Sequence, residues 1–231
     1  MTDRLPHAFA APDALRWSDT GGIITGGAPI FGEEQERSAN GGGAWVASCS
    51  GIRLETEADQ RTWEALILGW SMGDTKVVVP RCAGKLKAVF ARPLARVTHS
   101  DGTPFSDGTL YAGGHFGALA APLALRDTTA QIILPEGAAL LGGEPFTLVG
   151  NVYQERLYGV RRVLAVDVET NTYTVLFAKP AREAYPAGAE VDFGDPRCLM
   201  RARMADGTAW PEYDPAWHAD VSMVFRETFR L

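Results

Sequence analysis

The chain has 231 residues, a formal net charge of −6, 46% hydrophobic residues and 22% charged residues, as in an ordinary soluble globular protein. It is long enough for one large or two small domains with a buried core. The acidic balance argues against a nucleic-acid-binding protein, which would show a basic patch. No apolar run reaches the length of a membrane-spanning helix.

The three cysteines, Cys49, Cys82 and Cys198, show no metal-ligand spacing and cannot all pair with one another. A reduced, cytosolic site of folding is therefore the simplest interpretation. The first residues also lack the basic and apolar pattern of a secretion signal, so none is expected.

The N-terminal residues 1–43 carry little periodicity, and we expect loop with one short strand near Ile23 and Ile24. Two interpretations stay open for this region. It is either an arm that becomes ordered against a neighbouring subunit or a plain mobile N-terminus.

A strand is predicted over Ala44–Glu55, with Gly51 as a bulge or a point of close approach. Thr56 and Asp59 then form a weakened capping box, which predicts the start of a helix. Gly73 is placed to end that helix in a left-handed conformation. Four large apolar residues have helical spacing and predict a stripe that packs on a sheet: Trp63, Leu66, Ile67 and Trp70.

Two more strands are predicted at Lys76–Val79 and Lys85–Ala91, the second with alternating lysines that suit the edge of a sheet. Residues 92–126 show no usable period and are rich in Gly, Pro, Ser and Thr. We interpret them as a long excursion, because a structureless segment of this length is usually functional or partly disordered.

The last third of the chain has the pattern of a β meander. Apolar residues alternate over Tyr158–Val168 and again over Tyr173–Phe177, with a polar turn between them, which predicts a β-hairpin. Further strands are predicted, in chain order, at Thr128–Leu134, Pro145–Gly150, Val191–Met204 and Asp220–Phe229. In the last two strands the apolar side chains face away from charged ones, among them Arg201, Arg203 and Arg226.

The predicted fold class is mainly β: a β-sandwich lobe with one packed α-helix, plus a small antiparallel β-barrel lobe. We assign residues 1–92 to a sandwich or split-barrel-like lobe, with a helix at 57–72 and with 206–231 completing it. Residues 93–126 form the long loop excursion, and residues 127–205 form the small antiparallel barrel.

No residues with the pattern of an active site emerge. His99, Ser100 and Asp101 are adjacent, whereas a hydrolytic triad needs such groups to converge in space. The tripeptide at Asp192 resembles the metal-binding motif of protein kinases, but no other kinase element is present, so we interpret it as a strand end and turn. Cys198 lies on an apolar stripe and is interpreted as core. We therefore expect no catalytic residues, no cofactor and no metal, and no enzyme activity.

Large aromatic residues in loop-like surroundings are the candidates for an interface. Sugar stacking is the functional alternative, and plain packing under loops is the structural one. The candidate interface residues are Trp17, Tyr111, His115, Phe116, Trp210 and Trp217.

The order of these elements resembles the minor tail proteins of long-tailed, siphophage-type bacteriophages, of the distal-tail kind. In residues 44–91 the resemblance lies in the first strand, in the helix W-E-A-L-I-L-G-W and in the strand V-V-V-P. In residues 128–231 it lies in five segments: G-E-P-F-T-L-V-G, R-L-Y-G-V, Y-T-V-L-F-A-K-P, D-F-G-D-P-R-C-L-M-R and V-S-M-V-F-R-E. The length of 92–126 departs from the family's pattern and leaves the role of that segment open.

The resemblance implies a structural subunit of the tail tip, commonly a sixfold ring that joins the tail tube to the baseplate hub. The implied partners are copies of itself, the tube protein and the hub protein, in a virion made in the host cytoplasm. DNA would pass through the ring without specific binding, repelled by the acidic balance, and no membrane insertion is expected. We expect 92–126 and parts of 1–43 at subunit contacts. The alternative function is a carbohydrate- or receptor-binding β module of the tail.

Overall fold

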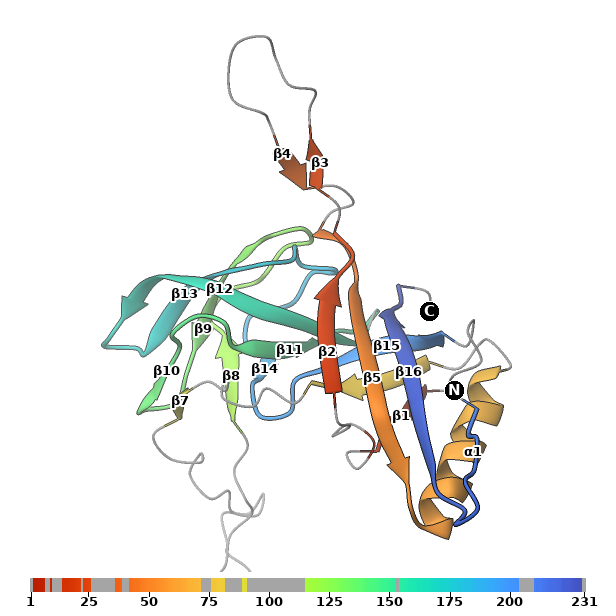
Figure 1. Ribbon diagram of the computed structural model, residues 1–231. Coiled ribbons are helices and arrows are strands. Elements are labelled where there is room, and N and C mark those ends of the chain that lie inside the picture. The colour runs from red at the N-terminus through yellow and green to blue at the C-terminus, as the bar shows by residue number, and fades with distance from the viewer. Residues whose placement is uncertain are drawn as a thin grey trace, which may run out of the picture. The chain divides into compact units, whose positions relative to one another are not determined.

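The fold of the protein was taken from a computed structural model and is mainly β with one helix (Figure 1). The predicted fold class, mainly β with one packed helix and a small antiparallel barrel, is confirmed. The chain divides into two compact units: unit 1 is Met1–Cys82 with Cys198–Leu231, and unit 2 is Ala83–Arg197. The structure describes residues 2–6, 9, 14–21, 23–25, 36–38, 42–71, 76–81, 89–90, 115–152, 154–203 and 210–229.

Unit 1 contains one curled six-stranded sheet rather than two facing sheets. Its strand order is β1 (Thr2–Arg4), β6 (Lys76–Pro80), β15 (Arg197–Arg203), β16 (Ala219–Glu227), β5 (Trp45–Leu54) and β2 (Ala14–Asp19). β1 runs parallel to β6, whereas β15, β16, β5 and β2 form antiparallel pairs. The short strands β3 (Ile23–Thr25) and β4 (Glu36–Ser38) pair with each other.

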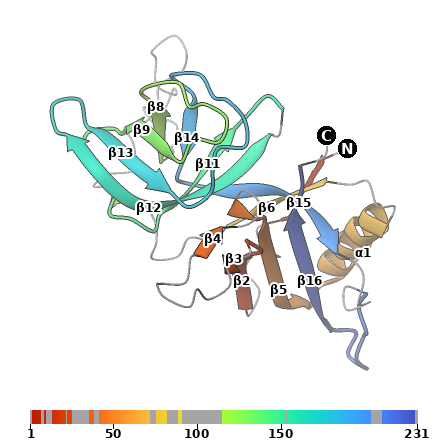
Figure 2. The same ribbon diagram turned by 90° about the horizontal axis from the view of Figure 1, so that it is seen from above.

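The helix α1 (Glu57–Ser71) lies along one face of this sheet (Figure 2). It begins with the predicted box: the Thr56 hydroxyl accepts from the Asp59 backbone N–H at 3.1 Å, and the Asp59 carboxylate accepts from the Thr56 backbone N–H at 3.2 Å. Of the predicted stripe, three residues are buried and Leu66 is half-buried; the buried ones are Trp63, Ile67 and Trp70. Trp70 of the stripe packs against Phe225 of β16, with ring centres 5.5 Å apart, so the stripe faces the sheet as predicted.

The bulge predicted at Gly51 is confirmed. Gly51 has a φ of 70°, a conformation that glycine adopts without a steric penalty. Around it the pairing of β16 with β5 skips one residue, from Val221 opposite Ile52 to Met223 opposite Cys49.

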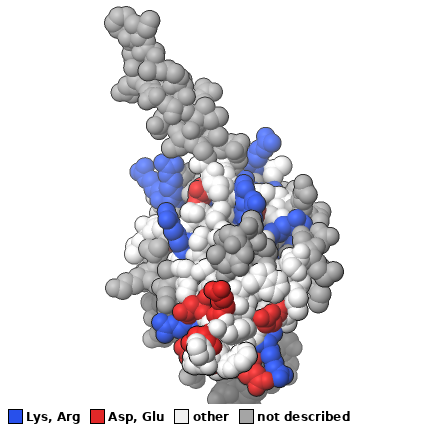
Figure 3. Space-filling model, turned by 45° about the vertical axis from the view of Figure 1, so that its right-hand side comes forward, with Lys and Arg blue, Asp and Glu red and all other residues white. Residues whose placement is uncertain are grey.

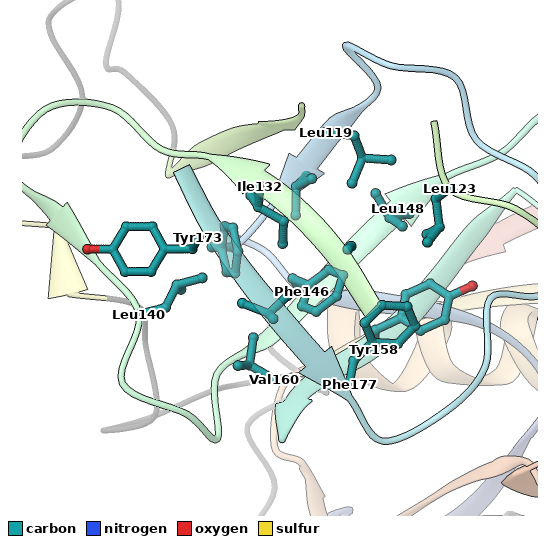
Figure 4. Packing of buried hydrophobic residues seen from close by; sticks show 14 of the residues in the cluster. Leu119, Leu123, Ile132, Leu140, Phe146, Leu148, Tyr158, Val160, Tyr173 and Phe177 are labelled. Atoms are coloured by element: carbon teal, nitrogen blue, oxygen red, sulfur yellow. The ribbon is translucent and has the colours of Figure 1, made fainter. Parts of the chain in front are cut away.

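Unit 2 is a closed six-stranded barrel. Its strand order is β11 (Pro145–Val149), β12 (Glu155–Asp167), β13 (Thr172–Phe177), β9 (Thr129–Ile133), β8 (Phe116–Leu119) and β14 (Glu190–Asp192). A separate short ladder joins β7 (Val89–Phe90) to β10 (Ala138–Ala139). The barrel interior is filled by aromatic and aliphatic side chains (Figure 4). At its centre the Phe146 ring stacks on Tyr158 with ring centres 5.6 Å apart and meets the Phe177 ring edge-on at 6.1 Å.

Four elements differ from the sequence analysis. β8 lies inside the predicted excursion 93–126, because a four-residue strand containing glycine is too short to show a period. β15 was assigned to the barrel lobe 127–205, but it pairs with β16 in the sheet of unit 1. β1 and β2 lie in the region 1–43, where only the strand near Ile23 was expected.

Apolar side chains in the second half of β12 and directly after it are unexpectedly exposed. Leu164, Val166 and Val168 continue the apolar alternation that begins at Tyr158, yet 45% or more of each of these three side chains is exposed. The cause lies in the pairing: β11 accompanies β12 only as far as Gly159, and two register shifts against β13 turn the later residues away from the core.

Most of the predicted strand Lys85–Ala91 and most of the excursion lie outside the described residues, as does Tyr111. The same holds for Gly73, which was expected to end the helix.

Candidate functional site

The first candidate interface residue, Trp17, lies on β2 and packs within unit 1. Its ring meets Trp45 edge-on at 6.2 Å, and the Arg81 guanidinium lies 5.8 Å from the Trp17 ring centre and 5.2 Å from that of Trp45. A cation over aromatic faces is attracted by their electron-rich surface. Burial lowers the pKa of Arg81. Trp17 is half-buried in this cluster, and a role for it in an interface stays a prediction.

Trp210 and Trp217 belong to one exposed segment, residues 210–218, that leads into β16. The segment turns at Asp214, whose carboxylate accepts from the backbone N–H groups of Ala216 at 2.9 Å and His218 at 2.8 Å. Trp217 has a φ of 63°, which this turn requires. The result is an indole presented to solvent with 71% of its surface exposed, while Trp210 is 46% exposed.

The 210–218 segment is attached to α1. The Tyr213 hydroxyl donates to the Glu64 carboxylate at 3.3 Å, and the Gln60 side chain donates to the backbone carbonyl of Trp217. The Tyr213 and Trp217 rings lie 6.1 Å apart. Partial desolvation and the neighbouring Glu64 raise the pKa of Tyr213. These contacts with α1 keep the Tyr213 and Trp217 rings in one position on the surface of unit 1. Exposed aromatic rings of this kind are common in interfaces.

Two of the pockets on unit 1 are lined mainly by charged residues. The first, of about 500 Å³, lies beside the 210–218 segment and is mainly acidic; its charged or titratable residues are Arg53, Glu55, Glu212, Asp214, His218 and Asp220. The second, of about 320 Å³, lies at the other end of β16 and is mainly basic; its charged residues are Arg201, Arg203, Arg226 and Glu227.

His115 and Phe116 lie in unit 2, at the start of β8. The His115 carbonyl accepts from the Phe193 N–H at 2.8 Å, and Phe116 pairs with Asp192 of β14. The kinase-like tripeptide is the predicted strand end and turn, since the Asp192 carboxylate accepts from the N–H groups of Gly194 and Asp195. His115 and Phe116 therefore help to join β8 and β14 within the barrel.

Several polar side chains are buried in the barrel, and most of them were missed by the sequence analysis. The hydroxyls of Tyr158 and Tyr185 are 3.3 Å apart, and Arg182 donates its backbone N–H to the Tyr158 hydroxyl at 3.0 Å. Burial, together with Tyr158, raises the pKa of Tyr185. Arg156 and Glu183 are also buried. Tyr158 begins the predicted apolar alternation. Arg156 lies before that alternation, and Arg182, Glu183 and Tyr185 lie in a proline-bounded loop, so no periodic signal marks these four residues.

Within unit 1, Trp17 and Trp217 lie near opposite ends of β5. Trp17 pairs with Ala47 of β5, whereas Trp217 precedes Ala219, which pairs with Leu54 at the other end of that strand. Trp210 and Trp217 share one segment of unit 1, and His115 and Phe116 are adjacent in unit 2. Sequence reasoning also missed the position of Arg81 beside two tryptophans and the pairing of Arg201 with Arg226 across two strands. Both contacts depend on which strands are neighbours in the sheet.

Within the described residues, no three His, Cys, Asp or Glu side chains gather in a way that could hold a metal ion. Cys49 and Cys198 are buried, and Cys82 lies outside the described residues. No helix in the described part of the chain has the length and apolar character needed to cross a membrane. Compared with known proteins, the chain matches no protein-family model and no curated protein sequence.

Proposed function

We propose that the protein is a structural subunit of the tail tip of a long-tailed bacteriophage, of the distal-tail kind. It forms a closed ring, sixfold as in the family it resembles, that joins the tail tube to the baseplate hub. Its partners are copies of itself, the tube protein and the hub protein, and its place is the virion after synthesis in the host cytoplasm. The function is assembly and involves no catalysis.

The order of the elements supports this proposal. W-E-A-L-I-L-G-W lies in α1 and V-V-V-P in β6, both in unit 1. R-L-Y-G-V lies in β12, and Y-T-V-L-F lies in β13, both in the barrel. Three motifs of 128–231 thus lie in the barrel unit, whereas D-F-G-D-P-R-C-L-M-R crosses into unit 1 and V-S-M-V-F-R-E lies in β16 of unit 1. The helix, the barrel and the closing strand follow one another in the order that the resemblance implies.

The observation that carries the ring is the open sheet of unit 1. Among the described strands, β2 pairs only with β5 and so forms an edge, whereas the barrel of unit 2 is closed. An edge strand presents unpaired backbone groups to a neighbouring molecule. Cyclic assembly covers such an edge by repeating one heterologous contact until the ring closes.

The mass of the purified protein in solution tests the proposal. Light scattering after size exclusion is expected to give a multiple of the 24.9 kDa chain, and negative-stain images are expected to show rings. A monomer at every concentration up to about 100 μM, far above the dissociation constants of most specific assemblies, contradicts it.

A carbohydrate- or receptor-binding module is the second candidate, and the exposure of Trp217 favours it. Its indole is 71% exposed, and the next residue, His218, lines the acidic pocket. An aromatic face beside carboxylate acceptors suits a sugar ring with its hydroxyls. Binding of a panel of host glycans to the wild type, lost in Trp217→Ala, would favour this candidate. A ring that binds no glycan would favour assembly.

A further inference from the structure

The sheet of unit 1 has one face that α1 does not cover. On the covered face, Phe225 of β16 packs against Trp70 of α1 with ring centres 5.5 Å apart. Side chains alternate along β16, so Asp220, Ser222, Val224 and Arg226 lie on the opposite face. This helix-free face is half-buried to exposed along its length.

Arginines gather at one end of the helix-free face. Arg201 of β15 is directly opposite Arg226 of β16, and Arg203 is opposite Val224. In the same row across the sheet, Val224 is opposite Ser48, which is opposite Arg16 of β2. Arg16, Arg203 and Arg226 are exposed, and Arg201 is half-buried.

This arrangement favours an anionic partner. Arg203 and Arg226 are both exposed on this face, and the guanidinium fork of each matches a carboxylate. The pocket of about 320 Å³ between these arginines gives such a group a place to enter.

Carboxylates gather at the other end of the same face. Asp220 and Glu55 lie at the ends of β16 and β5, and with Glu212 they line the acidic pocket. Figure 3 shows most of the acidic side chains on the face in view gathered in its lower part. Six residues of strand separate Asp220 from Arg226, so the two charged ends lie about 20 Å apart.

We propose that the arginine end of this face binds the acidic end of the same face on a second copy of this chain. The inference rests on the proposed ring and names the contact that builds it. Opposite charges at the two ends of one strand make the surface complementary to itself in a head-to-tail sense. Such a contact is heterologous, which is the type that closes a ring.

The charge balance favours a second copy over nucleic acid as the occupant. The chain carries a net charge of −6, which repels a polyphosphate at long range. In a head-to-tail contact, only the complementary ends meet. The contact is expected to weaken as salt rises from about 0.1 M to 1 M, because the screening length falls from about 10 Å to 3 Å.

Two charge-reversal variants test the contact. Arg203→Glu with Arg226→Glu makes the basic end acidic, and Glu55→Arg with Glu212→Arg makes the acidic end basic. Each variant alone brings like charges together and is expected to weaken self-association at least about a hundredfold, measured by sedimentation velocity. Asp220 is left unchanged because it faces Arg53 across the strands.

A 1:1 mixture of the two variants gives the decisive result. In an alternating ring every contact again joins opposite charges, so assembly is expected to return in the mixture. The control is Arg161→Glu with Arg162→Glu, at two exposed residues of the barrel unit. It changes the net charge by the same amount as Arg203→Glu with Arg226→Glu and is expected to leave assembly intact.

Three outcomes count against the inference, and they are distinguishable. If Arg203→Glu with Arg226→Glu assembles like the wild type, the contact is wrong while the proposed ring stands. If both variants fold, by circular dichroism, but their mixture stays monomeric, the head-to-tail contact is again wrong. If the wild type is itself monomeric, the proposed function and the inference both fail.

Discussion

Gly150 follows β11 at a point where the Glu183 carboxylate takes the space of a side chain. A Cβ built on Gly150 would lie 1.0 Å from one carboxylate oxygen of Glu183. That carboxylate is buried, and its other oxygen accepts from the Val152 backbone N–H at 2.9 Å. The absence of a side chain at residue 150 is therefore a condition for the position of Glu183.

Gly150→Ala is expected to lower the free energy of unfolding by about 1–3 kcal/mol, because it displaces a buried carboxylate and removes the acceptor of Val152. The matched control is Gly159→Ala, since nothing lies within 4 Å of a Cβ built there. Urea unfolding of both variants measures the difference. Equal stability of the two would show that Glu183 moves aside freely.

Tyr185 gives the barrel a dependence on alkaline pH. Burial raises the pKa of its hydroxyl above the usual value of 10.0, so the folded state holds this proton where the unfolded chain releases it. The stabilisation is complete below pH 10 and decreases as the pH rises further, by up to about 1.4 kcal/mol per pH unit. Tyr185→Phe is expected to show a shallower loss of stability between about pH 9.5 and 11. Parallel curves for wild type and variant would mean that Tyr185 titrates as it does in the unfolded chain.

For single residues, the sequence predicted the structural role correctly where the interacting partner is near in the chain. Thr56 and Asp59 are three residues apart, and Gly51 lies within its own strand, so local rules found them. Glu183 and Gly150 meet only through the closure of the barrel, and nothing in the sequence around either residue indicates the other.

The helix α1 is stabilised mainly by its aromatic stripe. Trp63 is fully buried, with its ring 5.4 Å from Phe9 and 5.9 Å from Trp70, both edge-on. Trp63→Ala is expected to cost about 3–5 kcal/mol of unfolding free energy, because the cavity it leaves cannot collapse. Leu68→Ala is the control: Leu68 is 58% exposed, and the change is expected to stay within about 0.5 kcal/mol. Similar midpoints in denaturant for the two variants would contradict a buried stripe.

Elements with a long, regular period were predicted well. The pattern of Val221, Met223 and Phe225 predicted β16 with one buried face, and the structure pairs it with β5 as expected. β8 was missed because four residues carry no period. β15 was found as a strand but assigned to the wrong neighbours, because alternation defines the faces of a strand and not its partners.

Along the chain, the barrel unit is inserted between the two segments that together form the sheet of unit 1. Unit 2 is continuous, from Ala83 to Arg197, and has a core of its own. Unit 1 is discontinuous, because β15 and β16 lie far along the chain from β5 and β6.

A fragment of residues 83–197 is therefore expected to fold alone and to unfold cooperatively, whereas a fragment of 1–82 is expected to remain unfolded until 198–231 is added. Dispersed amide resonances in a nuclear magnetic resonance spectrum would show each folded state. A folded 1–82 fragment, or an unfolded barrel fragment, would contradict this division.

The sequence analysis placed the end of the barrel at residue 205, whereas unit 2 ends at Arg197. The chain changes units without a break in its alternating pattern, since β14, the turn after Asp192 and β15 follow one another closely. Arg197 anchors the turn: its side chain lies 2.5 Å from the Asp192 carboxylate, and its backbone N–H donates to Thr147. A domain boundary with no linker composition leaves no mark in the sequence.

Because β16 lies between β15 and β5, the sheet of unit 1 can be completed only after the end of the chain has left the ribosome. Trp45 donates its backbone N–H to Glu227, a residue 182 positions later. At 5–20 residues per second, that partner emerges roughly 9 to 36 s after Trp45. The barrel is complete by then, while β5 still presents an apolar face without its neighbour. During this interval the first half of the nascent chain needs protection from aggregation. Pairing of β16 with β5 removes that need.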